Sequence, residues 1–169
     1  DRLGFFIYTA GNIPEGEKYL RESLRVREAA FGRDSLEYSE TENDLAMLLR
    51  DLQKMDDARA AAEHAVLIRE QQLGAQALPL AESLNTLGTV LGLGGDYIAA
   101  VTQFERAMSI HERRPERERA TEEYGTLCVN LAGTYQRIGR YDAAETAFQK
   151  GLDALRVRRV GHPAALVLA

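Results

Sequence analysis

The chain has almost no cysteine, because its 169 residues include only one, Cys128. One thiol cannot form an internal disulfide, so the sequence favours a reducing compartment, and we expect a cytoplasmic protein. Cys128 falls among apolar positions, and we expect it to be a buried structural thiol rather than a reactive one.

Long apolar runs are also missing. The run at the C-terminus, AALVLA, is far shorter than the roughly 20 residues that a membrane-spanning helix needs. The first residues, DRLGFFIYTAG, show neither the pattern of a secretory signal nor an initiator Met. We therefore expect no membrane association, and we expect the sequence to be an excised piece of a longer chain.

Positive charge is in short supply, with 21 Lys and Arg against 26 Asp and Glu and a net charge of −5. Binding to phosphate backbones requires a concentrated basic surface. The balance disfavours a nucleic-acid partner, even though RVRR at 156–159 is a local basic stretch.

Residues for catalysis are sparse. The three histidines, His64, His111 and His162, are far apart in sequence, and we expect each on the surface rather than at a metal site. The glycine-rich stretch GLGGD at 92–96 lacks the Lys-Ser/Thr of a phosphate-binding loop, and no serine has recurring His and Asp companions. We expect no enzymatic activity, no cofactor and no bound metal.

An internal repeat dominates what is present. Four segments align without a gap: LGFFIYTAGNIPEGEKYLRES from residue 3, LAMLLRDLQKMDDARAAAEHA from residue 45, LGTVLGLGGDYIAAVTQFERA from residue 87 and LAGTYQRIGRYDAAETAFQKG from residue 131. Their small second residues, Gly4, Ala46, Gly88 and Ala132, recur at spacings of 42, 42 and 44 residues. A fixed period of this length indicates a repeat architecture.

Each unit predicts a helical hairpin. Two apolar sets with steps of three and four residues flank a turn column made of Gly11, Gln53, Gly95 and Gly139. Pro14 suits the first turn of a second helix, and Asp96 is suited to cap the next one.

Small residues in fixed columns predict where the helices touch. We expect Gly88, Ala100 and Ala107 to mark close contacts, with Tyr97 and Phe104 filling the space between hairpins. A further repeated column, Glu28, Glu70 and Glu112, predicts charge pairs between adjacent hairpins.

These columns resemble the tetratricopeptide repeat, and the resemblance covers nearly the whole chain. The longer period and the tails LRVREAAFG at 24–32 and VLIREQQLG at 66–74 look like the kinesin-light-chain variety. The resemblance implies an all-α, right-handed superhelical solenoid of antiparallel helical hairpins. The third unit departs from the pattern, because HERRPERERA is two residues longer and contains Pro115, which we expect to re-aim the last hairpin.

The register divides the single repeat domain into units. These are 1–34 with a truncated first helix, 35–76, 77–118, 119–161, and 162–169 as the start of a fifth unit. A solenoid hairpin buries its apolar face only against its neighbours, and no polar capping helix is visible. We expect Phe5, Phe6 and Ile7 at one end, and 166–168 at the other, to be exposed and to cause self-association.

The resemblance implies a ligand groove on the concave side, lined by the first helix of every unit. Helical spacing places polar residues of three units on that side. The candidate ligand-binding residues are Tyr8, Glu40, Asn43, Met47, Arg50, Glu82, Asn85, Thr89, Asn130 and Arg137.

The asparagines have two interpretations. A row of Asn43, Asn85 and Asn130 can bind the backbone of an extended peptide, because an amide offers both donors and acceptors. Alternatively, they bond neighbouring helices and fix the stacking of the hairpins. Arg50 and Arg137 are suited to pair with an acidic side chain of a peptide.

One partner is disfavoured by charge. Chaperone-binding members of the family hold a C-terminal carboxylate with Lys and Asn, whereas the corresponding positions here carry Asp1, Phe5, Asp44, Glu82 and Thr86. We expect no binding of heat-shock-chaperone tails.

Three functions remain as hypotheses. The leading one is a protein-interaction scaffold that binds a peptide or partner domain along the concave groove. The alternatives are a sensor or regulatory arm of a larger enzyme, such as a nucleotide-switch ATPase or a caspase-like protease, and a self-assembling structural solenoid.

Overall fold

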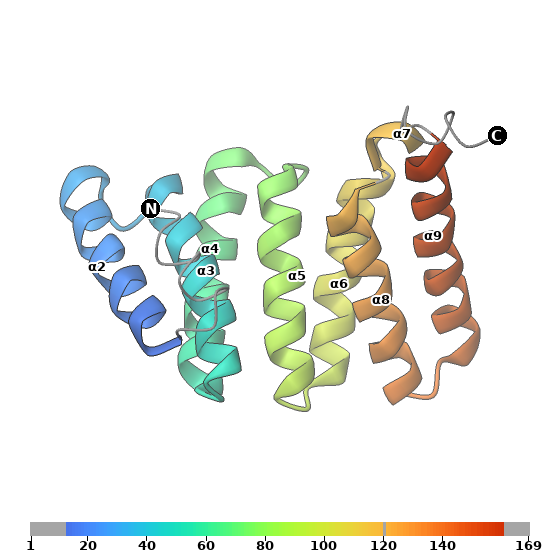
Figure 1. The fold of residues 1–169 in the computed structure, drawn as a ribbon, viewed down its shortest axis with the longest axis horizontal. Coiled ribbons are helices and arrows are strands. Elements are labelled where there is room, and N and C mark those ends of the chain that lie inside the picture. Colours follow the sequence, from blue (N-terminus) through green and yellow to red (C-terminus); the bar gives the residue numbers. More distant parts are fainter. Residues whose placement is uncertain (1–12, 120, 161–169) are drawn as a thin grey trace.

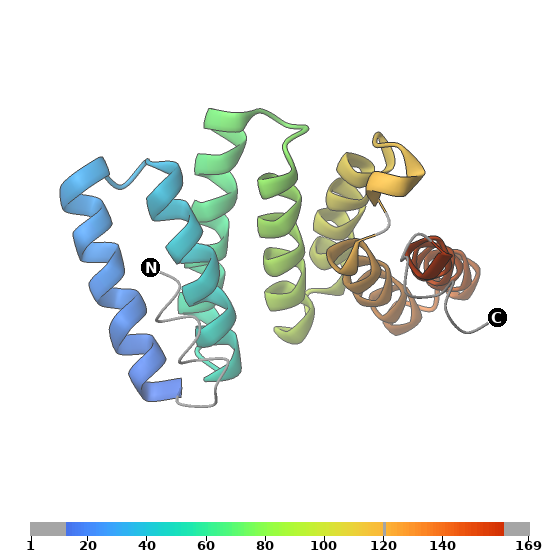
Figure 2. The same cartoon turned by 45° about the horizontal axis from the view of Figure 1, so that its top comes forward.

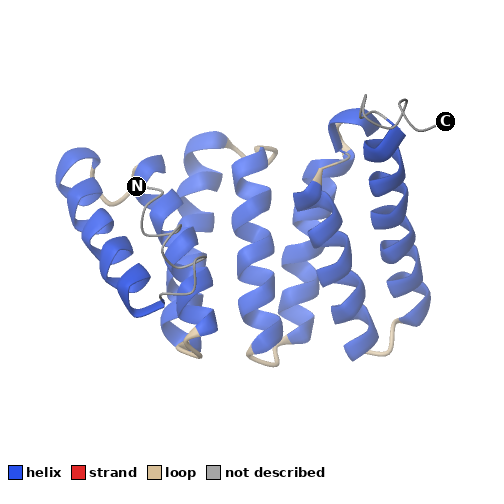
Figure 3. Cartoon of the chain, in the orientation of Figure 1, coloured by secondary structure: helices blue, strands red, loops and turns tan. Residues whose placement is uncertain are grey.

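The computed structural model describes residues 13–119 and 121–160, and this part of the chain contains helices and loops without strands (Figure 3). The helices are α2 (Ile13–Phe31), α3 (Leu36–Asp51), α4 (Met55–Leu73), α5 (Leu78–Leu93), α6 (Tyr97–Glu112), α7 (Glu116–Arg119), α8 (Glu122–Arg137) and α9 (Tyr141–Val160). The all-α solenoid that the sequence predicts is confirmed.

Antiparallel hairpins stand side by side in a row (Figure 1). They are formed by α3 with α4, α5 with α6, and α8 with α9, and α2 packs on α3 as the preceding second helix. Between hairpins, α4 packs on α5 and α6 packs on α8. Each hairpin is thus covered by its sequence neighbours, as in other solenoids.

Local sequence fixes where the helices begin. The Ser35 and Thr121 hydroxyls, in equivalent positions, accept hydrogen bonds from the backbone N–H of Tyr38 and Tyr124, both at 3.2 Å. The predicted cap at Asp96 is confirmed, because its carboxylate accepts from Ala99 N at 3.1 Å. Pro14 lies in the first turn of α2, as predicted.

The turn column of each hairpin adopts the left-handed backbone conformation. Gly95 and Gly139 have φ of 89° and 75°, and Gln53 holds the same place with φ of 59°. Glycine enters this region without steric cost, whereas the β-carbon of Gln53 is disfavoured there. The left-handed conformation of the turn therefore follows from its position in the repeat more than from the type of residue found there.

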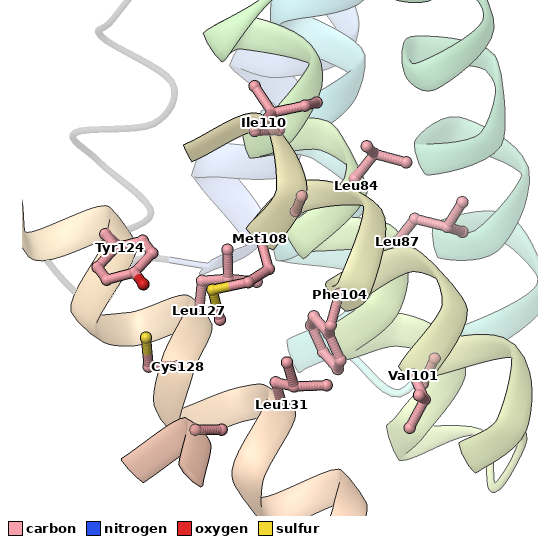
Figure 4. Packing of buried hydrophobic residues seen from close by; sticks show 14 of the residues in the cluster. Leu84, Leu87, Val101, Phe104, Met108, Ile110, Tyr124, Leu127, Cys128 and Leu131 are labelled. Atoms are coloured by element: carbon pink, nitrogen blue, oxygen red, sulfur yellow. The ribbon is translucent and has the colours of Figure 1, made fainter. Parts of the chain in front are cut away.

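The core is built from small and large residues in alternation. Ala46, Gly88 and Ala132 of the second repeat column are all buried. The ring of Phe104 lies against Gly88, so close that a β-carbon built there would be 2.6 Å from the nearest ring atom. Side chains of α5, α6 and α8 converge around Phe104 (Figure 4), which confirms that it fills the space between hairpins.

The last hairpin is turned relative to the others. In Figure 2, α9 is seen almost end-on, whereas α2 to α6 are seen lengthwise. The longer third linker contains Pro115 and forms the short helix α7, which packs against α9. The expected change of direction after the third unit is thus present.

His111 corrects one expectation. It was expected on the surface, but only 8% of it is exposed, and its ring packs on Tyr124 with centroids 5.5 Å apart. Burial lowers the pKa of His111 below its ordinary value. His162 lies outside the described residues.

Replacement of Gly88 by Ala tests the close approach of α5 and α6. We expect Gly88→Ala to lower the free energy of unfolding by about 1–3 kcal/mol, because Phe104 must move to admit the new β-carbon. Urea denaturation measures the change. Gly133→Ala on α8 is the matched control, since no atom lies within 4 Å of its added β-carbon. It should be stabilising by about 0.5–1 kcal/mol through helix propensity. Equal effects of the two changes would contradict the packing described.

Candidate functional site: the inner face of the first helices

The inner face is defined here as the side of the solenoid formed by the first helices α3, α5 and α8. Consecutive first helices contact one another, α3 with α5 and α5 with α8. In the described part of the chain, consecutive second helices such as α4 and α6 make at most marginal contact. The row of hairpins is therefore tightest along the first helices, which is the inner side of a curve.

Most of the predicted groove residues are accessible on these helices. The partly or fully exposed ones are Glu40, Met47, Arg50, Glu82, Asn85, Thr89, Asn130 and Arg137. Asn43 is the correction: only 1% of it is exposed and its Oδ1 has no hydrogen-bond partner, so it lies inside the helix packing and not on the accessible face. Tyr8 lies outside the described residues.

Two of the asparagines bridge neighbouring hairpins. Asn130 Nδ2 on α8 donates to Asn85 Oδ1 on α5 at 3.1 Å, and it lies 3.4 Å from Thr89 Oγ1. These bonds join α5 and α8, which are neighbouring first helices, directly. The contacts fit the interpretation in which the asparagines fix the stacking, while both side chains stay partly accessible.

Two buried arginines tie a second helix to the first helix that follows it, one between α2 and α3 and one between α4 and α5. Arg69 Nη1 on α4 donates to the carbonyl oxygen of Pro79 at 2.6 Å and to Glu82 Oε2 at 2.8 Å. Arg27 on α2 repeats the arrangement with the carbonyl oxygen of Glu37 and with Glu40 Oε2. These contacts were not predicted from the sequence, although each arginine precedes its glutamate by the same 13 residues.

Three carboxylates gather on the inner face, and we call Glu40, Asp44 and Glu82 the acidic patch. Glu40 and Asp44 lie one turn apart on α3, and Glu82 lies on α5. Arg27 and Arg69 partner the two glutamates, but Asp44 makes no hydrogen bond or ion pair to any residue that the structure describes.

The environment of Asp44 opposes its ionisation. Burial raises the pKa of its carboxyl to about 7, and the charges of Glu82 and Glu40 add to the shift. The guanidinium groups of Arg69 and Arg27 offset only part of it. Asp44 is thus a carboxylate that would gain from a cation placed beside it.

The outer side carries charge pairs between second helices. Arg106 bonds Glu70 at 2.7 Å, and Lys150 bonds Glu112, which confirms the expected pairing for both glutamates. Glu28 differs, because its pair is Arg33 at 4.0 Å, in the linker that follows its own helix. These pairs are largely exposed and each contributes at most about 1 kcal/mol.

Other chemistry is limited in this part of the molecule. Cys128 is buried as expected, and burial raises the pKa of its thiol to about 11, which opposes reactivity. Among residues 13–119 and 121–160, no group of three or more His, Cys, Asp or Glu is placed to hold a metal ion. No helix there is both long and apolar enough to cross a membrane.

Comparison with known families agrees with the repeat seen in the structure. Three models described as tetratricopeptide repeat match residues 1–37, 37–113 and 125–154. The chain belongs to the tetratricopeptide repeat family. Repeats of this family indicate a scaffold for protein–protein interaction.

Solved structures share this tetratricopeptide fold. BtubC (BKLC) from P. vanneervenii superposes with a TM-score of 0.81 at 19% identity, covering 95% of this chain and 63% of that one. A Podosopora anserina putative kinesin light chain with nearly identical TPR-like repeats gives 0.78 at 16% identity, covering 98% and 78%. The fold is therefore that of kinesin-light-chain-like repeat proteins.

Curated relatives are much longer than this chain. A clustered mitochondria protein homolog of Emericella nidulans is 26% identical over 160 residues, and one of Ajellomyces capsulatus is 27% identical over 159 residues. The matches cover 94% and 93% of this chain but 12% of each relative. This chain therefore spans only a small part of the length of the curated relatives that it matches.

Removal of a buried arginine should destabilise the stack. We expect Arg69→Met to lower the free energy of unfolding by about 2 kcal/mol, because the Pro79 carbonyl and Glu82 lose their partner. The matched control is Arg106→Met, whose ion pair is about 40% exposed on both sides and should cost less than about 1 kcal/mol. Chemical denaturation of both variants checks the difference, and similar losses would argue against a structural role for Arg69.

Asp44 should make stability depend on pH. Its pKa is raised in the folded state, so its contribution to stability is present in acid and is lost as pH rises through about 7. We expect Asp44→Asn to raise the free energy of unfolding by about 1–3 kcal/mol at about pH 8 and to have little effect near pH 4. Denaturation of both proteins across this range measures it. A gain that is the same at every pH would refute the shift.

Proposed function

We propose that this tetratricopeptide domain is a scaffold whose inner face binds an extended, positively charged segment of a partner protein. The observation that carries the proposal is Asp44, a mostly buried carboxylate close to the charges of Glu40 and Glu82 that forms no ion pair or hydrogen bond with any described residue. A Lys or Arg side chain from a partner would supply the missing charge. The same acidic patch disfavours a nucleic-acid strand, whose phosphates it would repel.

The spacing of the first helices suits an extended chain. Packed helices lie about 8–10 Å apart, and three residues of an extended polyproline II chain, which make one full turn, span about the same distance. A segment crossing α3 and α5 would therefore present every third side chain to a new first helix. Basic residues at that interval match carboxylates that stand on neighbouring helices.

Neighbouring groups on the inner face would complete the recognition. The partly accessible amides of Asn85 and Asn130 offer donors and acceptors to a peptide backbone. Met47, on the turn of α3 after Asp44, provides adaptable apolar contact. Arg50 is held by Asp51 at 2.7 Å, and Arg137 lies 5.8 Å from the centre of the Tyr97 ring. These cations stand beyond the acidic patch and would favour an acidic residue at the end of the segment.

A synthetic peptide with lysine at every third position tests the proposal by isothermal titration. We expect the peptide to bind more tightly at about pH 8 than at about pH 6, because the bound lysine requires ionised Asp44. Asp44→Asn should weaken binding about tenfold, and added salt should weaken it further. The same peptide with acetylated lysines should not bind.

The control variant is Glu63→Gln, which removes an equal charge from an exposed position on the second helix α4. It should leave the affinity almost unchanged. Equal losses from Glu63→Gln and Asp44→Asn would mean that only net charge matters and would sink the proposal. Tight binding of the acetylated peptide would do the same.

A further inference from the structure

One position near the end of each second helix joins its hairpin to the next, and the residue there changes at the third junction. The repeat places Arg27, Arg69 and His111 in this position, at intervals of 42 residues. The two arginines hold a carbonyl oxygen and a glutamate of the following first helix. Arginine stays protonated in proteins, whereas histidine ordinarily changes charge near about pH 6.5. The third junction therefore has a titratable group where the first two have a permanent cation.

The glutamate that partners each arginine is also absent from the third junction. Glu40 and Glu82 are equivalent positions on α3 and α5, and the longer third linker puts the next equivalent position at Thr126 on α8. Thr126 is exposed, as the two glutamates are. The ring of His111 makes no hydrogen bond or ion pair with any residue that the structure describes.

The surroundings of His111 favour its neutral form. Its ring packs against the buried Tyr124 of α8, and burial lowers the pKa of His111. The positive charge of Arg114, in the linker, lowers it further. Glu123 on α8 opposes the shift, but its carboxylate is exposed and therefore screened by water and salt. Arg119 on α7 adds another positive charge, 5.7 Å from the centre of the Tyr124 ring.

Other carboxylates at this junction already have partners. Helix α5 also packs on α6, and its one charged residue, Glu82, is held by Arg69. Glu112, the last residue of α6, pairs with Lys150 of α9. A proton on His111 would thus place a charge in a mostly buried site without a carboxylate bonded to it, which is unfavourable.

We propose that the third junction is a pH-dependent hinge, in which protonation of His111 releases the last hairpin, α8 and α9, from the rest of the stack. The released histidine regains its ordinary pKa of about 6.5, whereas the docked one has a lowered pKa. The contribution of His111 to docking is therefore fully present above about pH 6.5 and is lost as pH falls through the lowered pKa.

The third junction differs from the first two in the ways that a hinge requires. Its linker is longer and contains the short helix α7, and the last hairpin is already turned relative to the others (Figure 2). The first two junctions keep their arginine contacts throughout this pH range. The hinge lies outside the acidic patch on α3 and α5, so its test does not depend on peptide binding.

Hydrogen exchange of the 169-residue protein, followed by mass spectrometry of its peptides, tests the proposal. Between about pH 7.5 and about pH 5.5, we expect the protection of α8 and α9 to fall by about threefold to tenfold after correction for intrinsic exchange rates. Helices α3 and α5 should keep their protection. His111→Gln should abolish the fall in α8 and α9, because the glutamine side chain does not titrate.

A carboxylate introduced at residue 126 tests the role of the missing glutamate. Thr126→Glu should abolish the acid loss of protection, because protonated His111 then gains the kind of partner that Glu40 and Glu82 give to the arginines. Thr126→Gln is the matched control, since it has nearly the same shape without the charge, and it should retain the loss. Both variants should fold because Thr126 is exposed.

Three outcomes would each overturn the hinge. The first is an acid loss of protection that is as large in α3 and α5 as in α8 and α9. The second is a loss that persists in His111→Gln, and the third is the same pH response in Thr126→Glu and Thr126→Gln.

Discussion

The close approach of the two helices within each hairpin is the constraint on which the rest of the structure depends. The first helix of each hairpin has a small residue at the point where the second helix crosses it. These residues are Ala46, Gly88 and Ala132. In the middle hairpin, the Phe104 ring lies directly on Gly88, and the rest of that ring is available to pack toward α8. One residue therefore closes a hairpin and joins it to the next, so that hairpin geometry and stacking are fixed together.

Stacking in turn decides which charges reach the inner face. Arg27 and Arg69 are buried where one hairpin meets the next, and each holds a glutamate of the following first helix. At the third junction the same position is His111, the linker is longer, and the last hairpin is turned (Figure 2). The acidic patch consequently spans α3 and α5 and does not continue onto α8, where Asn130 forms a bridge instead.

Much of the fold was predictable from the sequence, because its signals are periodic. The small columns, the glycine turns and the Asp96 cap all follow from residue type at a fixed interval. Most groove residues were also placed on accessible parts of the first helices. Asn43 was misplaced because helical spacing gives the side of a helix but not how deeply its neighbour covers it. His111 was misplaced, and the arginine contacts were missed, because polar residues usually signal exposure, and only the packing of the next hairpin buries these.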